Sequence, residues 1–122
     1  NDSLEHFPDP YPALELCKCK LASDGVVVCS IPNVRYIENV YHFLVEMDWQ
    51  YQESGILDTT HLRFFTKKSM IRLFEQSGYK VDLITGINPY YFRLVHYLNK
   101  FTFDRFDEFK YTQFLVRAMK DA

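Results

Sequence analysis

The chain has 122 residues, 48% of them hydrophobic and 25% charged, a composition that indicates one folded globular domain and excludes a disordered one. The formal net charge is -2, and Lys and Arg form no cluster beyond Lys67 and Lys68, so nucleic acid is not expected as a partner. The longest apolar run, residues 26–31, is too short for a membrane span, and no signal peptide opens the chain, so we expect a cytoplasmic location.

The predicted elements alternate between helices and strands. Apolar residues recur at helical spacing over residues 10–22, and Asp9 stands where a helix cap is expected. Residues 25–32 follow as a β-branched run without polar alternation, which is typical of a central strand covered on both faces. Helical periodicity then returns from Tyr36 to Met47.

The second half continues this alternation after an irregular stretch. No helical period survives over residues 48–65, so we predict a loop that carries function. Thr66 is suited to cap a helix that ends before Gly78. Three further elements are predicted: a strand over 79–87, a helix over 90–101 and a last strand over 110–119. The order is typical of an α/β fold with helical crossovers.

The cysteine pattern gives no sign of a metal site. The three cysteines are Cys17, Cys19 and Cys29, and the first two would point to different faces of the predicted helix. No second Cys/His pair has the spacing of a zinc site. We therefore expect reduced thiols and no bound metal.

The glycine pattern provides no turn that could cradle a cofactor within this chain. No two of the four glycines lie closer than about eight residues, so a G-x-G turn is missing. The opening NDSLEHFPDP looks like a loop that leaves the carboxyl end of a strand. We therefore expect that strand and the cofactor cradle upstream of Asn1.

Three motifs carry a family resemblance: LEHFPDP, then DGVVVCSIPNV, then the D-x-x-H-x-R-x-F-T run of residues 58–66. Together they resemble the second half of class I S-adenosylmethionine-dependent methyltransferases, particularly bacterial members associated with polysaccharide or glycan assembly. The resemblance covers residues 1 to about 87 and implies an α/β fold: the C-terminal part of a Rossmann-like seven-stranded sheet. Strands 5, 6 and 7 would lie in the order 5-7-6 with flanking helices and the last strand antiparallel. Residues 1–122 would then be a single partial domain, the C-terminal half of a methyltransferase domain.

The resemblance also implies roles for the first residues. Asn1, Asp2 and Ser3 match the segment beside the methionine and sulfonium end of S-adenosylmethionine, the implied cofactor. Glu5 and His6 match a carboxylate and an imidazole that face the acceptor, where His6 would orient or deprotonate a hydroxyl. The alternative is that Glu5 and His6 cap the next helix or hydrogen-bond to each other.

The loop 48–65 would form a lid over the acceptor site, beyond the carboxyl ends of the strands. His61 would act as a general base or orient the acceptor; the alternative is a structural hydrogen bond to Asp58 or to a backbone group. Arg63 would pair with Asp58 or Glu53, or else bind an anionic acceptor.

Aromatic side chains in and near this loop suggest an acceptor wall. Trp49, Tyr51 and Tyr36 are suited to contact a sugar or another ring, while ordinary core packing is the alternative. Together with Glu5, Asp58 and Arg63, Trp49 completes the set of candidate substrate-binding residues.

Methyl transfer from S-adenosylmethionine to an unidentified small-molecule or sugar acceptor is the expected function. Positioning of the reacting atoms does most of the work in such a reaction. A hydrolase is disfavoured because the sequence contains no G-x-S-x-G nucleophile motif. The alternative is a non-catalytic half-domain that binds a partner carrying the cofactor-binding half, or that self-associates through an exposed sheet edge.

Overall fold

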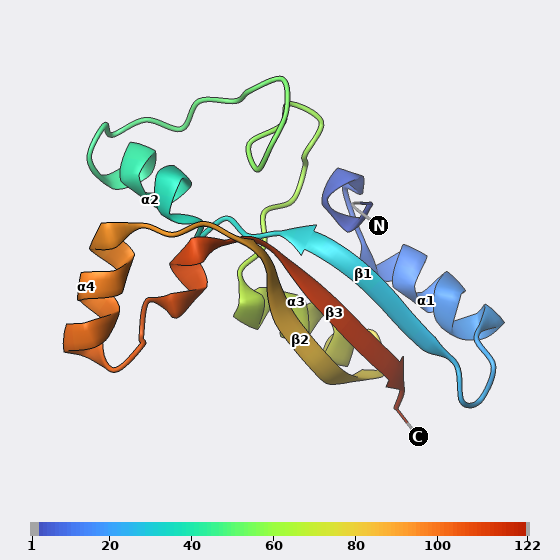
Figure 1. The fold of residues 1–122 in the computed structure, drawn as a ribbon. Coiled ribbons are helices and arrows are strands. Elements are labelled where there is room, and N and C mark those ends of the chain that lie inside the picture. Colours follow the sequence, from blue (N-terminus) through green and yellow to red (C-terminus); the bar gives the residue numbers. More distant parts are fainter. Residues whose placement is uncertain (1–2, 122) are drawn as a thin grey trace.

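Three strands form the sheet on which the rest of the chain is assembled (Figure 1). The computed structural model describes residues 3–121. The strands are β1 (Val26–Pro32), β2 (Tyr79–Pro89) and β3 (Tyr111–Lys120), in the spatial order β1-β3-β2. Because β3 pairs antiparallel with both neighbours, β1 and β2 run parallel to each other. The α/β class, the position of the last strand between the other two and its antiparallel direction are confirmed.

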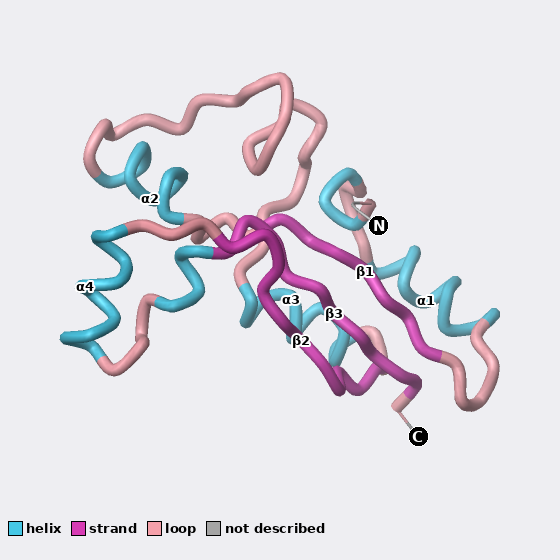
Figure 2. The backbone as a smooth tube through the Cα atoms, viewed as in Figure 1, coloured by secondary structure: helices cyan, strands magenta, loops and turns pink. Residues whose placement is uncertain are grey.

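Every predicted helix is present, with its ends shifted by a few residues (Figure 2). The helices are α1 (Tyr11–Lys20), α2 (Ile37–Leu44), α3 (Lys67–Gln76) and α4 (Arg93–Thr102), and two short 3-10 turns are η1 (Leu4–His6) and η2 (Asp107–Lys110). Within the described residues, no helix is long and apolar enough to cross a membrane.

The start of α3 is fixed by a reciprocal cap. The Thr66 hydroxyl accepts a hydrogen bond from the backbone N–H of Ser69 at 3.2 Å, and the Ser69 hydroxyl accepts one from the Thr66 N–H at 2.8 Å. Both donors would otherwise lack an intrahelical partner. The predicted role of Thr66 is confirmed, and Gly78 follows the helix with a φ of 75°, a conformation that glycine adopts at little cost.

The core lies on one face of the sheet, under α1 and α3. Met70 and Phe74 of α3 pack in one buried cluster with Ile31 of β1 and Val116 of β3, and Leu14 of α1 joins them. Complete burial of each such apolar side chain contributes about 1.5–3 kcal/mol. This buried cluster therefore stabilises the sheet, at whose end the long loop lies.

The prediction that residues 25–32 are covered on both faces is wrong for the described chain, whereas their predicted central position concerned a seven-stranded sheet of which three strands are described, and it stays a prediction. In the described sheet β1 lies at an edge, and the side chains of Val26 and Val28 are 45% and 46% exposed. The reason is that α1 and α3 pack on the same face, while α2 and α4 lie beyond one end of the sheet (Figure 1).

That end of the sheet carries the long loop. The carboxyl ends of β1 and β2 point toward α2 and α4, and residues 45–66 arch over the end of β1 (Figure 1). Asn33, which is fully buried, anchors the junction through side-chain hydrogen bonds to the backbone carbonyls of Glu108 and Tyr111, both at 2.9 Å. The irregular conformation predicted for residues 48–65 is confirmed, apart from isolated single-residue bridges.

Candidate functional site

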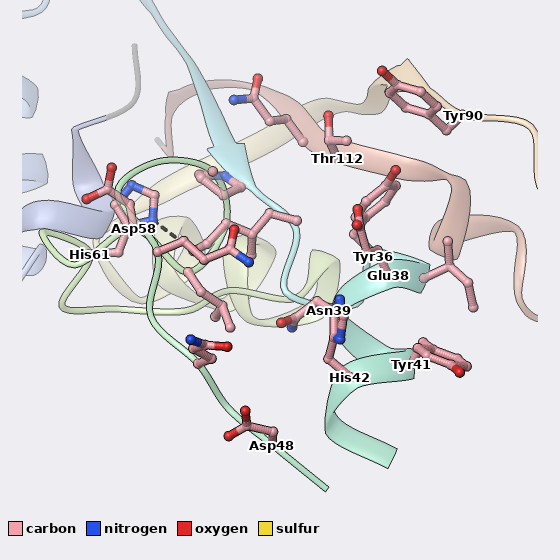
Figure 3. Close-up of a pocket in the computed structure, with 18 of the residues that line it drawn as sticks. Tyr36, Glu38, Asn39, Tyr41, His42, Asp48, Asp58, His61, Tyr90 and Thr112 are labelled. Carbon is pink, nitrogen blue, oxygen red and sulfur yellow. Dashed lines mark hydrogen bonds between the residues drawn. The ribbon is translucent and has the colours of Figure 1, made fainter. Parts of the chain in front are cut away.

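An open cavity of about 1050 Å³ lies beyond the carboxyl ends of β1 and β2. Its walls come from α2, from residues 48–61 of the loop, from the segment between β2 and α4, and from the first residues of β3 (Figure 3). Ligands of open α/β sheets bind at this edge, so the cavity is the candidate acceptor site.

The cavity is lined by acidic groups. Five carboxylate side chains contribute to its walls: Glu5, Glu38, Glu46, Asp48 and Asp58. None of the described residues that line it is a lysine or an arginine. A concave surface with one sign of charge concentrates counter-ions, so the cavity favours neutral or cationic molecules over anionic ones.

An aromatic wall faces these carboxylates. Tyr36 makes edge-to-face contacts with Tyr90, at 6.3 Å between ring centroids, and with Phe92, at 5.8 Å. Burial, followed by the nearby charge of Glu38, raises the pKa of the Tyr36 phenol, which therefore stays neutral near pH 7. Sequence reasoning found Tyr36 but missed Tyr90 and Phe92, which reach the wall from beyond β2.

Trp49 does not line the cavity. Its ring packs edge-to-face against Phe43, at a centroid distance of 5.9 Å, and against Phe64, at 5.2 Å. Tyr51 also contacts Phe64, at 6.1 Å. These contacts agree with the alternative of ordinary packing, and contact of Trp49 and Tyr51 with an acceptor stays a prediction.

Glu5, His6 and His61 meet at the inner end of the cavity. The Nε2 atoms of His6 and His61 each lie 4.0 Å from Oε1 of Glu5, and the ring centroids are 4.8 Å apart with an interplanar angle of 72°. Glu5 is only 1% exposed and His61 is 9% exposed, whereas the side chain of His6 is 41% exposed. Each residue was a candidate from the sequence, but their convergence was not predicted.

Backbone hydrogen bonds hold the loop to η1. The carbonyl of Glu5 accepts from the N–H of Leu62 at 2.7 Å and from the N–H of Arg63 at 3.0 Å. These bonds join segments that are far apart in the sequence, so the cluster is assembled by tertiary structure.

Each imidazole has a fixed orientation. Nδ1 of His6 lies 3.1 Å from the carbonyl oxygen of Thr60, and Nδ1 of His61 lies 2.9 Å from that of Ile56. A carbonyl only accepts hydrogen bonds, so Nδ1 is the donor in both rings. In the neutral form, Nε2 of each ring therefore presents a lone pair toward Glu5.

Arg63 reinforces the junction instead of forming the predicted ion pair. Its Nε donates to the carbonyl oxygen of Pro8 at 2.7 Å, and a terminal nitrogen donates to the same oxygen. Among the described residues, no ion pair joins Arg63 to Asp58 or Glu53. The prediction of such a pair is wrong because the guanidinium points toward the segment that follows η1.

Asp58 stabilises the turn before His61. Its Oδ1 accepts hydrogen bonds from the Thr60 hydroxyl at 2.6 Å and from the Thr60 N–H at 2.8 Å. These bonds hold the pKa of the Asp58 carboxyl below its usual value. The bond from the Thr60 hydroxyl has the largest effect, and the charge of His61 makes a smaller contribution. The His61 imidazole does not bond to this carboxylate; its alternative role, a hydrogen bond to a backbone group, is the one observed.

The remaining candidates lie before the cluster. Asn1 and Asp2 are outside the described residues, so their proposed contact with the cofactor stays a prediction. Ser3 is exposed, and its carbonyl accepts from the His6 N–H at 3.1 Å. The alternative in which Glu5 and His6 cap the following helix is wrong, because Asp9 accepts from the first N–H of α1, at 3.1 Å.

Comparison with known proteins identifies the family. No curated protein matches the chain. The family whose model matches is described as a methyltransferase domain, and the match covers residues 1–84. This segment is more than half of the chain and includes η1, the loop and His61, so the resemblance to methyltransferases found in the sequence is confirmed. The protein therefore belongs to the methyltransferase-domain family.

Proposed function

We propose that this chain is the acceptor-binding part of an S-adenosylmethionine-dependent methyltransferase, and that the acceptor occupies the cavity beside Glu5, His6 and His61. The observation that carries the proposal is the cluster of Glu5, His6 and His61, the first and last of them buried, beside an acidic, aromatic cavity and within the segment that matches the family. In this assignment β1, β2 and β3 correspond to strands 5, 6 and 7 of a seven-stranded sheet, and the loop 48–65 is the lid.

The charge of the cavity fits one end of the cofactor. S-adenosylmethionine carries a positive sulfonium and supplies an electrophilic methyl group when bound. The carboxylates and aromatic faces that line the cavity suit such a cation. Ser3 and the backbone leading to η1 would lie beside the methionine and sulfonium end, whereas no glycine-rich turn is present in this sequence to complete the cofactor site.

The cluster would activate the acceptor. Positioning supplies most of the rate enhancement in methyl transfer, but a hydroxyl or ammonium acceptor must also lose a proton. In their neutral forms, His6 and His61 carry bare Nε2 atoms that can accept it. The Glu5 carboxylate, 4.0 Å from both Nε2 atoms, would stabilise the positive charge that results.

The lining also restricts the acceptor. Because no described lining residue is a lysine or an arginine, a phosphorylated or carboxylated group inside the cavity would gain no counter-charge. The rings of Tyr36, Tyr90 and Phe92 offer faces for a sugar or another flat apolar surface. We therefore propose a neutral or amine-bearing small molecule or sugar as the acceptor.

Cofactor binding and acceptor selection test this function. The full-length protein should bind S-adenosylhomocysteine with a dissociation constant in the micromolar range or tighter, a free energy of about -8 kcal/mol or more favourable. Calorimetry measures that binding, and methyl transfer from labelled cofactor to matched pairs of acceptors, with and without a phosphate, measures the selection. Absence of cofactor binding to the folded full-length protein would overturn the proposal, and preferred transfer to phosphorylated acceptors would overturn the acceptor class.

A second candidate function is an interaction module that pairs with another copy of itself. The observation that favours it is the outer edge of β1, which pairs with no strand of the described chain and carries exposed Val26 and Val28. Sedimentation of the isolated 122-residue chain should show a dimer that Val28→Lys reduces to a monomer. A monomer that binds S-adenosylmethionine at micromolar concentration would exclude the module.

A further inference from the structure

We propose that Glu5, His6 and His61 form a binding site for one divalent transition-metal ion, of the kind that imidazole nitrogen binds well. Nothing in the cysteine or histidine spacing of the sequence indicates this site, because its ligands come from η1 and from the distant loop. It lies at the inner end of the cavity, where Glu5 and His61 form part of the wall.

The donor set is suited to such an ion. Two imidazole nitrogens and one carboxylate oxygen bind zinc in hydrolytic enzymes and iron in oxygenases, with further positions left open for water or substrate. The candidate ligand atoms of the three residues all lie within 4.8 Å of one another, and each Nε2 is 4.0 Å from Oε1 of Glu5. Ligand atoms that bind one ion at about 2.0–2.2 Å lie about 3 Å from one another. Side-chain rotations that move the ligand atoms by about 1 Å would therefore complete the site.

The surroundings of the two imidazoles match those of metal ligands. A metal-binding histidine almost always donates its second ring N–H to a carbonyl or a carboxylate, which fixes the ring and increases its basicity. His6 does so to Thr60 and His61 does so to Ile56. These bonds leave Nε2, the nitrogen nearest Glu5, as the ligand atom in both rings.

The local charges favour a cation. Glu5 is almost completely buried, and a buried carboxylate is stabilised by positive charge close to it. Asp58 adds negative charge near both imidazoles. The nearby guanidinium of Arg63 is directed to the Pro8 carbonyl, outside the cavity.

The backbone pre-organises the cluster. The carbonyl of Glu5 is tied to the N–H groups of Leu62 and Arg63, one and two residues beyond His61. The ligand from η1 and the ligand from the loop are therefore held together before an ion arrives, which lowers the entropy cost of binding.

The ion would change how the cluster serves methyl transfer. A Lewis acid that contacts the acceptor oxygen would make the hydroxyl a stronger acid and orient it; because the Nε2 atoms would then be occupied as ligands, the proton would pass to water in the open cavity. This role of the ion rests on the proposed function, whereas the binding of the ion rests on the cluster alone.

A titration with Co²⁺ as the only added metal tests the site, because the visible absorption of Co²⁺ reports its coordination. The metal-free chain should bind one Co²⁺ at micromolar concentration. Since loss of supporting residues alone weakens metal sites about 10–100-fold, His61→Ala and Glu5→Gln should each weaken binding about 100-fold or more. His42→Ala is the matched control: His42 also contacts a glutamate, Glu46, and its loss should leave the affinity unchanged.

A second measurement needs no variant and so does not depend on the folding of one. The chain has four histidines, and substoichiometric paramagnetic Co²⁺ should broaden the imidazole NMR signals of His6 and His61 while those of His42 and His96 stay sharp. Equal broadening of all four signals, or of none, would overturn the proposal. Displacement of Co²⁺ by Mg²⁺ at equal concentration would also overturn it, because Mg²⁺ prefers oxygen ligands.

The two proposals fail separately in these tests. Metal binding is read from absorption and NMR without any cofactor or acceptor. Loss of the metal site with cofactor binding intact would leave the methyltransferase function in place, with the imidazoles as direct proton acceptors. Metal binding without cofactor binding would support the metal site and contradict the proposed methyltransferase function.

Discussion

Two histidine–glutamate contacts in this molecule differ in almost every respect except their chemistry. Nδ1 of His42 donates to Glu46 at 2.6 Å on the surface of α2, and both side chains are well exposed. His61 lies farther from Glu5, at 4.0 Å, but both residues are buried and join distant parts of the chain. The shorter contact is a local helical pair, which water and salt screen; the longer one has a lower effective dielectric around it and fixed neighbours. Burial and support, more than distance, distinguish a candidate site from a surface pair.

The largest effect should come from removing the buried imidazole. In the full-length protein, His61→Ala should lower methyl-transfer turnover about 100-fold, because it removes an acceptor-activating group. His96→Ala should leave turnover within about twofold, because His96 is an exposed residue of α4 that does not line the cavity. Steady-state kinetics measure both, and affinity for S-adenosylhomocysteine should be the same in the two variants. Equal loss of turnover in both variants would show that the buried imidazole has no special role.

The junction between the loop and η1 should matter next. Arg63→Ala removes the guanidinium that binds the Pro8 carbonyl, and a hydrogen bond with a charged donor contributes about 1.5–3 kcal/mol. The bond is exposed, so solvent screening should reduce its contribution below this range, to about 1 kcal/mol. Chemical denaturation measures this loss, and limited proteolysis should cut within residues 48–65 faster than in the unchanged protein. Arg72→Ala, which removes an arginine from α3, is a control that should leave the cleavage rate unchanged.

The turn before His61 should give a smaller, pH-dependent effect. The pKa of the Asp58 carboxyl is lowered in the folded state, chiefly by the Thr60 hydroxyl. Its contribution to stability is therefore present above the unfolded-state pKa and is lost as pH falls through the folded-state pKa. Thr60→Val should raise the Asp58 pKa toward its ordinary value, which carboxyl NMR titration measures. An unchanged titration midpoint of Asp58 in this variant would show that the Thr60 hydroxyl does not lower the pKa of the Asp58 carboxyl.

The surface pair should give the smallest effect on stability and still be visible in a titration. The hydrogen bond with Glu46 raises the pKa of the His42 imidazole above its ordinary value. A raised histidine pKa contributes stability that is complete below the unfolded-state pKa and is lost as pH rises through the folded-state pKa. In Glu46→Gln the NMR titration midpoint of His42 should fall, with no measurable change in denaturation midpoint. A large loss of stability would place this pair in the same class as the buried one.

Local features of the fold were readable from the sequence because they depend on neighbouring residues. The cap formed by Thr66, the helix that follows it and the turn at Gly78 all arise within a few positions of one another. The class of the sheet followed from the alternation of helices and strands, and the order of the strands from the family resemblance. The exposure of one face of β1 did not follow, because an apolar run indicates burial without saying which part of a protein covers it.

The site was readable only in part, because its geometry is non-local. The sequence singled out Glu5, His6 and His61, but nothing in their spacing states that all three side chains meet, since His6 and its partner Thr60 are 54 residues apart. Arg63 was assigned the wrong partner for a related reason: opposite charges nearby in sequence suggest an ion pair, whereas the side chain meets a carbonyl from a distant segment. A pattern identifies which residue types are available, and tertiary structure decides which of them touch.

The way the loop is attached separates two kinds of evolutionary change. Residues 60–63 are joined to η1 through Glu5 and His6 and to the segment after it through Pro8, whereas Asp48 and Gln50 contribute to the cavity from an exposed stretch earlier in the loop. Insertions and substitutions in the exposed stretch can reshape the space offered to a ligand while Glu5, His6 and His61 stay in register. A lineage built on this arrangement can diversify what the cavity recognises without rebuilding the cluster beside it.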